Sequence, residues 1–340
     1  IFEGFSIWKD EKYRQLQGTY PVISLSFARI KEGSYKNARD KICEIVQNIY
    51  SKYAFVRDSD AFGISDKAFF DRIVTGSYSE SDMTSSLHQL SRFLHLYYKK
   101  NVIILLDEYD TPMQEAYVKG YWEELVEFTR SLFNATFKTN PYLERALMTG
   151  ITRASKESIF SDLNHLEVVT TTSDKYGTSF GFTEEEVFDA MDDFGLTAQK
   201  ENVKFWYDGF VFGQHKDIYN PWSILNFLDK GQIGAYWANT SANSLVAKLL
   251  REGNRRLKEQ FESLLADEVL YTPIDEQIVY NQLNGSEKAI WSLLLASGYL
   301  KVLSVGQREN MYDVREPKYA LALTNMEVKV MFNNMVRSWF

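Results

Sequence analysis

The chain has 340 residues, of which 45% are hydrophobic and 25% charged, a composition typical of globular domains. Its formal net charge of −8 lacks the basic excess of a chain whose main task is binding a nucleic-acid backbone. The single cysteine, Cys43, excludes an internal disulfide and fits a reducing compartment, so we expect a cytoplasmic location. Because Cys43 lies within a helical repeat of apolar residues, we expect a small buried side chain rather than a nucleophile.

Length and hydropathy limit the architecture further. The chain is long enough for two domains, and no stretch approaches the roughly 18 apolar residues of a membrane span. No signal peptide is recognisable. The first residue is Ile rather than Met, so we expect the natural protein to extend upstream.

The first half of the chain predicts strands alternating with helices. Residues 20–27 and 102–106 are rich in branched residues, and helical periodicity marks 34–53, 83–97 and 121–137. Residues 145–149 predict a further buried strand before Gly150, and 54–80 a long connection with short helical pieces. Alternation of this kind predicts a parallel sheet with helices on both faces.

The pattern changes near residue 178 and becomes mainly helical with a little strand. Thr183 and Glu186 form a capping-box signature at a helix start. Further helices are predicted at 221–228, 241–250, 255–265, 286–296 and 325–339, and the strands 300–305 and 319–323 are expected to pair as a hairpin. We therefore divide the chain into a domain of residues 1–178 and a domain of residues 179–340.

An apolar run ends in acids at Asp107, Glu108 and Asp110. Ligands of open α/β sheets bind beyond the carboxyl ends of strands, and Mg²⁺ prefers carboxylate, water and phosphate oxygens. We expect Asp107 to hold Mg²⁺ directly or through water, and Glu108 to orient or deprotonate a water that attacks a γ-phosphate. Asp110 would support the site. The alternative is that these acids form a solvated turn, which is common at strand ends.

The ordered motifs of this chain resemble those of the AAA-ATPase-like family. The segment LLDEYDTPM at 105–113 resembles that family's Walker B strand, and MTGITRASKESIFSDLNHL at 148–166 resembles its sensor strand and loop. Later blocks are similar to its helical domain: FGFTEEEV, YDGFVFG, IYNPWSILNFL, YWANTSANSLV, IWSLLLASGYL and LTNMEVKVMF.

The resemblance implies a P-loop-NTPase-like parallel sheet flanked by helices, followed by a mainly helical, winged-helix-like domain. It implies that ATP and Mg²⁺ serve the intact protein and that Arg153 contacts the γ-phosphate, with Thr149 or Thr152 on the lytic water. The alternative for Arg153 is an ion pair with a nearby acid. Pro221 would lie against adenine, although proline at a first helical turn is also structurally favoured.

Two elements of that family are missing from the sequence. No G-x-x-x-x-G-K-[ST] string occurs, so the phosphates lack their cradle and we expect no nucleotide bound to this chain alone. The family's PD-(D/E)XK nuclease-like domain would follow residue 340, and that domain or a protein partner is the expected target of regulation.

Two other functions remain open. The first is a non-catalytic interaction or scaffold module serving a nuclease-like or toxin-type effector, because fold does not imply function. The second is nucleic-acid binding by the basic residues of the helical half, for which a charged helix surface is the simpler explanation: Arg251, Arg255, Arg256 and Lys258.

Overall fold

The computed structural model describes residues 2–151, 163, 165–238, 244–276, 283, 286–306 and 316–337. The chain divides into two compact units, residues 1–166 and 167–340, which are described separately. None of the described helices combines the length and apolarity needed to cross a bilayer.

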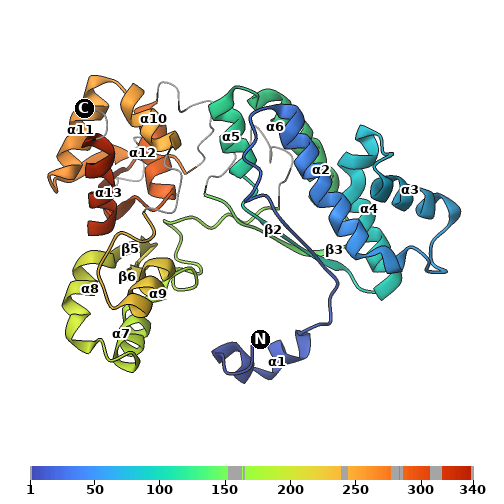
Figure 1. Ribbon diagram of the computed structural model, residues 1–340, viewed down its shortest axis with the longest axis horizontal. Coiled ribbons are helices and arrows are strands. Elements are labelled where there is room, and N and C mark those ends of the chain that lie inside the picture. Colours follow the sequence, from blue (N-terminus) through green and yellow to red (C-terminus); the bar gives the residue numbers. More distant parts are fainter. Residues whose placement is uncertain are drawn as a thin grey trace. The chain divides into compact units, whose positions relative to one another are not determined.

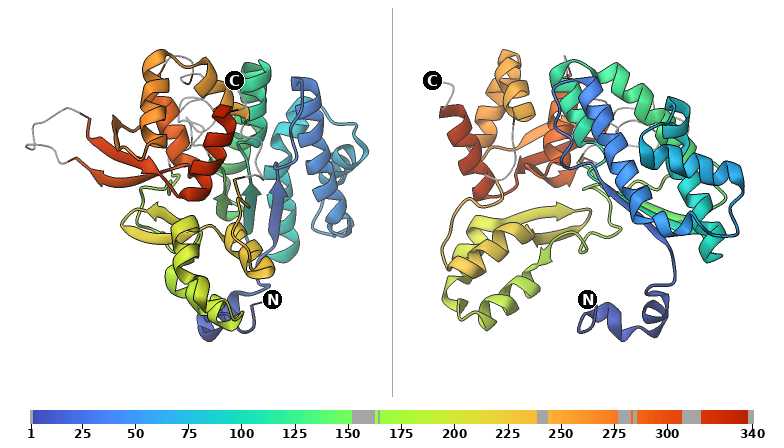
Figure 2. Two further views of the ribbon diagram at one scale, coloured as in Figure 1. Left: turned by 60° about the vertical axis from the view of Figure 1, so that its left-hand side comes forward. Right: turned by 45° about the vertical axis from the view of Figure 1, so that its right-hand side comes forward.

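The first unit is built on a parallel sheet of three strands in the order β1-β2-β3 (Figure 1). The strands are β1 (Val22–Ser26), β2 (Val102–Asp107) and β3 (Leu143–Met148). Figure 2 shows them side by side. Its helical elements are η1 (Ser6–Lys9), α1 (Glu11–Leu16), α2 (Tyr35–Lys52), η2 (Ala54–Val56), α3 (Ile64–Thr75), α4 (Glu80–Tyr98), α5 (Thr111–Lys119) and α6 (Trp122–Phe137).

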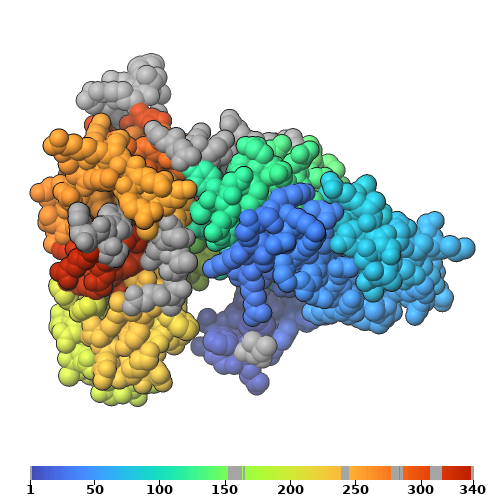
Figure 3. Space-filling model, turned by 45° about the horizontal axis from the view of Figure 1, so that its top comes forward, coloured from blue at the N-terminus to red at the C-terminus, as the bar shows by residue number. Residues whose placement is uncertain are grey.

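The helices α2, α4 and α6 pack against one another as a layer on the sheet. In the space-filling view, the blue and cyan surface of α2, α3 and α4 is continuous (Figure 3). The buried side chains of α2 recur at helical spacing and include Cys43, which is 1% exposed, as the sequence predicted. Helix α4 begins with a capping box between Ser79 and Asp82. Apolar periodicity and local caps therefore account for this layer.

The other face of the sheet corrects the sequence prediction. Burial alternates along β2, with Val102, Ile104 and Leu106 inside and Leu105 37% exposed. Leu147 of β3 is 56% exposed, so β3 is not the buried strand that its apolar composition indicated. Helices therefore do not bury both faces of β2 and β3 within the part of the chain that the structure describes. Branched residues favour an extended strand whether or not its second face is covered.

The second unit contains two antiparallel three-stranded sheets, more sheet than the sequence indicated. Their orders are β4-β6-β5 and β7-β9-β8. The strands are β4 (Phe182–Thr183), β5 (Asp208–Phe212), β6 (His215–Tyr219), β7 (Leu270–Pro273), β8 (Leu300–Val305) and β9 (Lys318–Leu323). The β8–β9 pairing confirms the predicted hairpin.

The hairpin of β5 and β6 was not predicted, because its strands do not alternate cleanly between apolar and polar residues. It turns at Gly213, whose φ is +57°. Gly209 within β5 has a φ of +136°, and a Cβ there would lie 1.9 Å from the Thr324 carbonyl oxygen. Both positions therefore require glycine.

Helices pack against the two sheets of this unit. They are α7 (Glu184–Asp193), η3 (Thr197–Gln199), α8 (Lys200–Tyr207), α9 (Pro221–Lys230), α10 (Ser244–Glu252), α11 (Arg255–Leu265), α12 (Glu287–Ala296) and α13 (Met326–Arg337). The predicted capping box opens α7, where the Thr183 and Glu186 side chains bond each other's backbone N–H. One core joins α7, α8, β6 and α9: Val187, Met191, Val203, Tyr207, Tyr219, Ile224, Phe227 and Leu228.

Candidate functional site

Three polar side chains meet where the strands of the parallel sheet end. The register pairs Ser26 of β1 with Asp107 of β2, and Leu106 of β2 with Met148 of β3. Thr149, the residue after β3, is therefore the neighbour of Asp107 on its other side. Because parallel strands end at the same edge, residues far apart in sequence come together here. We call these three residues, Ser26, Asp107 and Thr149, together with Glu108, which follows Asp107 in the chain, the strand-tip cluster.

The Asp107 carboxylate lies between two hydroxyl groups. Ser26 Oγ donates to Oδ2 at 2.9 Å, and Thr149 Oγ1 donates to Oδ1 at 2.8 Å. A carboxylate offers about four lone-pair directions, so these bonds fix its orientation and leave acceptor capacity on both oxygens. Asp107 is exposed, and this remaining capacity faces solvent.

The backbone continues the sheet beyond the strand ends. Phe27 N–H donates to the Asp107 carbonyl at 2.9 Å, and Thr149 N–H donates to the Leu106 carbonyl at 2.9 Å. Tyr109 N–H then donates to the Thr149 carbonyl at 3.1 Å. The three segments that carry the cluster are thus hydrogen-bonded to one another, which holds the carboxylate on a rigid support.

Glu108 adopts a conformation that its side chain disfavours. Its φ of +49° lies in the left-handed region, which costs a residue with a Cβ about 1–2 kcal/mol. Its N–H donates to Thr149 Oγ1 at 3.3 Å, and Thr111 Oγ1 donates to its Oε2 at 2.7 Å. Strain of this kind persists where neighbouring contacts impose it, and it concentrates at functional sites.

Asp110 differs from the exposed Asp107 and Glu108 of the cluster in being buried. Its side chain is 4% exposed, at the N-cap position of α5. A Cβ on Gly150 would lie 2.6 Å from Asp110 Oδ1 and 2.8 Å from the Tyr109 ring. Only glycine lets the chain after β3 pass this close, so Asp110 and Gly150 fix the path of that segment.

The remaining predicted residues are placed differently. Thr152 and Arg153 lie outside the described residues. Pro221 belongs to the second unit and occupies the first turn of α9, whose N-cap Asn220 accepts bonds from the N–H groups of Trp222 and Ser223. The structure therefore gives Pro221 the favourable helix-start position that its sequence context predicted.

Sequence reasoning missed Ser26 and Thr111. Ser26 is the last residue of β1, on the face opposite the buried Ile23 and Leu25, and that alternation was the available signal. Thr111 is three residues after Glu108 at the start of α5, a spacing that places its hydroxyl beside the Glu108 carboxylate.

The donor set of the cluster suits a hard cation that brings other ligands with it. No group of three or more His, Cys, Asp or Glu side chains with metal-binding geometry occurs among the described residues. Mg²⁺ in phosphate-transfer sites takes one or two protein carboxylates and completes its shell with water and phosphate oxygens. Asp107, oriented and partly unsatisfied, fits that role as the holding residue.

A second group of charges lies in the second unit, around Asp208. Burial and the neighbouring Asp217 carboxylate raise the pKa of Asp208 to about 6. Burial also lowers the pKa of Lys301, which faces the same acids. Asp217 has a φ of +56°, and Lys204 pairs with Glu184 beside it. These groups lie at the junction of α7, α8, β5, β6 and β8.

Two of the basic residues proposed to touch nucleic acid are paired with acids. Arg255 Nε lies 2.7 Å from Glu259 Oε1, and Arg256 Nε lies 3.5 Å from Glu287 Oε2. Both are largely exposed. This arrangement is that of a charged helix surface.

Comparison with known proteins bears on the first unit most directly. A family model named AAA-ATPase-like, described as a predicted AAA-ATPase, matches residues 1–160, which include the whole strand-tip cluster. A protein of Azotobacter chroococcum mcd 1, described as an uncharacterized protein in the vnfD 5' region, is 26% identical over 247 residues. That match covers 72% of this chain and 44% of the relative, so the chain spans less than half the relative's length. No solved structure matches.

Proposed function

We propose that this chain, whose residues 1–160 match the model of the AAA-ATPase-like family, is part of a regulatory ATPase that binds and hydrolyses ATP. The observation that carries the proposal is Asp107 held between two strand-end hydroxyls, next to a Glu108 in strained conformation. An oriented acid at a parallel-strand tip can hold Mg²⁺ for phosphoryl transfer, as the Walker B Asp of P-loop NTPases does, and a second acid beside it can orient the attacking water.

In this proposal β2 is the Walker B strand, and the residues at its tip and beside it have distinct roles. Asp107 would hold Mg²⁺ directly or through water, and the ion would neutralise charge on the phosphate oxygens. Glu108 accepts the proton of the attacking water or orients that water, and its bond from Thr111 positions the carboxylate. Thr149 orients Asp107 through its donated hydrogen bond. Asp110 keeps the segment after β3 in place.

The resemblance supplies the remaining roles. Arg153 would stabilise charge that develops on the transferred phosphoryl group, Thr152 would contact the lytic water, and Pro221 would contact adenine. The sequence has no Gly-Lys-Ser/Thr phosphate-binding string, so we propose that the 340-residue chain binds ATP weakly by itself. Hydrolysis is then a property of the full-length protein in the cytoplasm, where it regulates a nuclease-like domain or a protein partner.

The test is ATP turnover by the full-length protein carrying Asp107→Asn or Glu108→Gln. A general base contributes about 10²–10⁴-fold to rate, so Glu108→Gln should lower kcat at least about 100-fold. Asp107→Asn should lower the rate and raise the Mg²⁺ concentration needed for half-maximal turnover, because an amide binds a hard cation less tightly than a carboxylate. Glu144→Gln, an exposed acid at the start of β3, is the matched control and should turn over normally. Unchanged turnover in both Asp107→Asn and Glu108→Gln would refute the proposal.

A second candidate is a non-catalytic interaction module. It is favoured by the missing phosphate-binding string together with an exposed apolar hollow in the second unit. For the second domain as a whole we also propose a winged-helix-like fold, which the order α11, β7, α12, β8 and β9 around the sheet β7-β9-β8 supports. A wild-type full-length protein without ATPase activity would favour this candidate.

Nucleic-acid binding is the least supported of the three functional hypotheses. Helix α12 is almost wholly buried, from Ala289 to Leu295, so it offers little surface to a groove. A gel shift that falls steeply with salt would support the reading, because phosphate contacts release counterions.

A further inference from the structure

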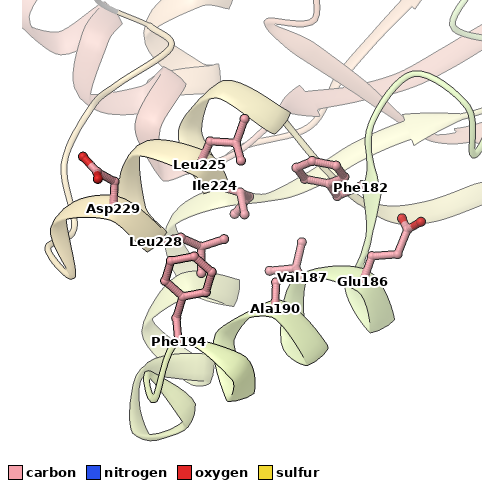
Figure 4. Close-up of a pocket in the computed structure, with 9 residues that line it drawn as sticks. All are labelled: Phe182, Glu186, Val187, Ala190, Phe194, Ile224, Leu225, Leu228 and Asp229. Atoms are coloured by element: carbon pink, nitrogen blue, oxygen red, sulfur yellow. The ribbon is translucent and has the colours of Figure 1, made fainter. Parts of the chain in front are cut away.

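The second unit carries an apolar hollow between α7 and α9, with a cavity volume of about 420 Å³. We call it the α7–α9 groove. Figure 4 shows its floor of Val187, Ala190, Ile224 and Leu228, with Phe182 and Phe194 at its two ends. The carboxylates of Glu186 and Asp229 lie at opposite ends of this apolar surface (Figure 4).

The groove is preformed. Val187 and Ile224 are each 1% exposed and belong to the core that joins α7 to α9. Helix α7 is fixed at its start by the Thr183–Glu186 capping box. Helix α9 is capped by Asn220 at its start and ends at Gly231, whose φ is +63°. A surface already held in place loses little conformational entropy when a partner docks on it.

Phe194 and Leu225 line the hollow and also reach solvent, and Trp222 continues the apolar surface beyond it. Phe194 is 61% exposed, and Leu225 and Trp222 are each 53% exposed. On α9 the residues Trp222, Leu225 and Asp229 are spaced three and four apart, so they lie on one face. A small ligand is largely enclosed by its pocket, whereas an apolar stripe that continues outside the hollow is typical of a macromolecular interface.

The rim of the groove is acidic. Helix α7 has no basic residue, and its acids include Glu185, Asp189 and Asp193, all exposed. Two other acids of α7 are already paired, Glu184 with Lys204 and Asp192 with Lys200. Asp189 and Asp193 are three and seven residues after Glu186, which places them along the edge of the groove. Complementary charge on a partner would therefore be positive.

We propose that the α7–α9 groove docks an amphipathic helix of a partner protein that bears Lys or Arg beside its apolar stripe. A furrow between two helices suits a third helix, whose anchors at i, i+3 or i+4 and i+7 enter the hollow. Helix α9 has ten residues, so an apolar stripe of two to three turns, roughly 15 Å, matches its length. This interaction does not depend on ATP hydrolysis by the first unit.

The probe is a fluorescein-labelled synthetic helix of about 15 residues, with Leu at i, i+4 and i+7 and Lys on the flanking positions. Fluorescence anisotropy with the 340-residue chain should show saturable binding that weakens as salt rises from about 0.05 to 0.3 M. Phe194→Ala and Leu225→Ala should each weaken binding about 10-fold or more, as anchors of an interface do. Asp229→Asn should weaken binding less and reduce its salt dependence.

Matched controls lie on α8, outside the groove. Phe205 is 66% exposed, so Phe205→Ala removes an equally accessible aromatic ring, and Glu201→Gln removes an exposed charge. Both variants should bind the Lys-flanked peptide as the unaltered chain does. A control peptide with Glu in place of Lys on its flanks should bind the unaltered chain much more weakly. Circular dichroism of each variant separates a lost surface from a lost fold.

The proposal is overturned if the Lys-flanked peptide shows no saturable binding, or if it binds Phe194→Ala and the unaltered chain equally. It is also overturned if light scattering shows self-association of the chain that Phe194→Ala abolishes, because a second copy is then the occupant. Equal binding of Lys-flanked and Glu-flanked peptides would refute the charge selection.

Discussion

Two carboxylates, Asp107 in the first unit and Glu327 in the second, stand in opposite relations to solvent. Asp107 in the first unit is exposed, and its two hydroxyl bonds leave it able to bind more. Glu327 in the second unit is 0% exposed and accepts bonds from Ser223 Oγ at 2.7 Å, Trp237 N–H at 2.7 Å and Ala238 N–H at 3.3 Å. An acid with spare, accessible acceptors serves a ligand, whereas one whose bonds end inside the protein joins its structural elements.

The largest effect that this comparison predicts is on stability, at Glu327. Glu327→Ala leaves the Ser223 hydroxyl and two backbone N–H groups without their acceptor, and should cost about 3–4 kcal/mol of unfolding free energy. Urea unfolding of the chain measures this loss. Glu201→Ala, an exposed acid on α8, should change stability by less than about 0.5 kcal/mol. A cost below about 1 kcal/mol at Glu327 would show that its buried bonds do not join α13 to α9.

The next effect concerns activity, at Thr149. Thr149→Val keeps the shape of the side chain but removes the hydroxyl that orients Asp107. Loss of a hydrogen bond that orients a metal-binding carboxylate lowers activity about 10-fold or more. ATP turnover by the full-length protein should therefore fall about 10-fold. The unfolding free energy should change less than it does in Glu327→Ala. Thr149→Ser retains the hydroxyl and should restore turnover. If Val and Ser variants were equally active, the orienting role would be wrong.

The half-buried Asp208 of the second unit should make the stability of the fold depend on pH. The pKa of Asp208 is raised to about 6 by burial and by Asp217, against about 3.9 in an unfolded chain. The folded state therefore binds this proton more tightly, so the stabilisation is complete below pH 4 and is lost as pH rises through 6.

Asp208→Asn removes that titration. We compare the stability of the variant, relative to the unaltered chain, at pH 8 and at pH 4. This relative stability should be about 1 kcal/mol more favourable at pH 8, after allowing for partial solvent screening. Thermal unfolding at the two pH values measures the change. An increment that is the same at pH 4 and pH 8 would contradict the assignment.

The smallest effect tests the strain at Glu108. Glu108→Gly should relieve the left-handed conformation and raise stability by up to about 1 kcal/mol, although it removes the proposed catalytic carboxylate. Glu108→Ala removes the same carboxylate but keeps the Cβ, so it should gain nothing. Equal stability of the Gly and Ala variants would show that the backbone at Glu108 stores no strain.

Local signals were sufficient for much of the fold. Apolar periodicity predicted α2, α4, α6 and α11, and the Thr183–Glu186 pair predicted the start of α7. These elements are determined by neighbours within a few residues, which a single sequence displays. The helix α5 and the β5–β6 hairpin escaped prediction because short, irregular patterns carry weaker signals.

Residue types at the candidate site were predictable only in part. Asp107, Glu108, Asp110 and Thr149 stand out because each follows an apolar run, whereas Ser26 became visible only through the β1–β2 register. The burial of Asp110 and the exposure of Leu105 and Leu147 also had no local signal. Each depends on what packs against that position, which is a long-range property.

The sequence by itself determined that a parallel sheet would present acids at the tip of its strand β2, because strand and helix periods are local. Only the tertiary structure decided that Ser26 and Thr149 hold Asp107 from both sides, and that Glu108 is strained next to them. Those relations join residues 81 and 42 positions apart in the chain. They exist because strand register, rather than sequence distance, sets which side chains meet.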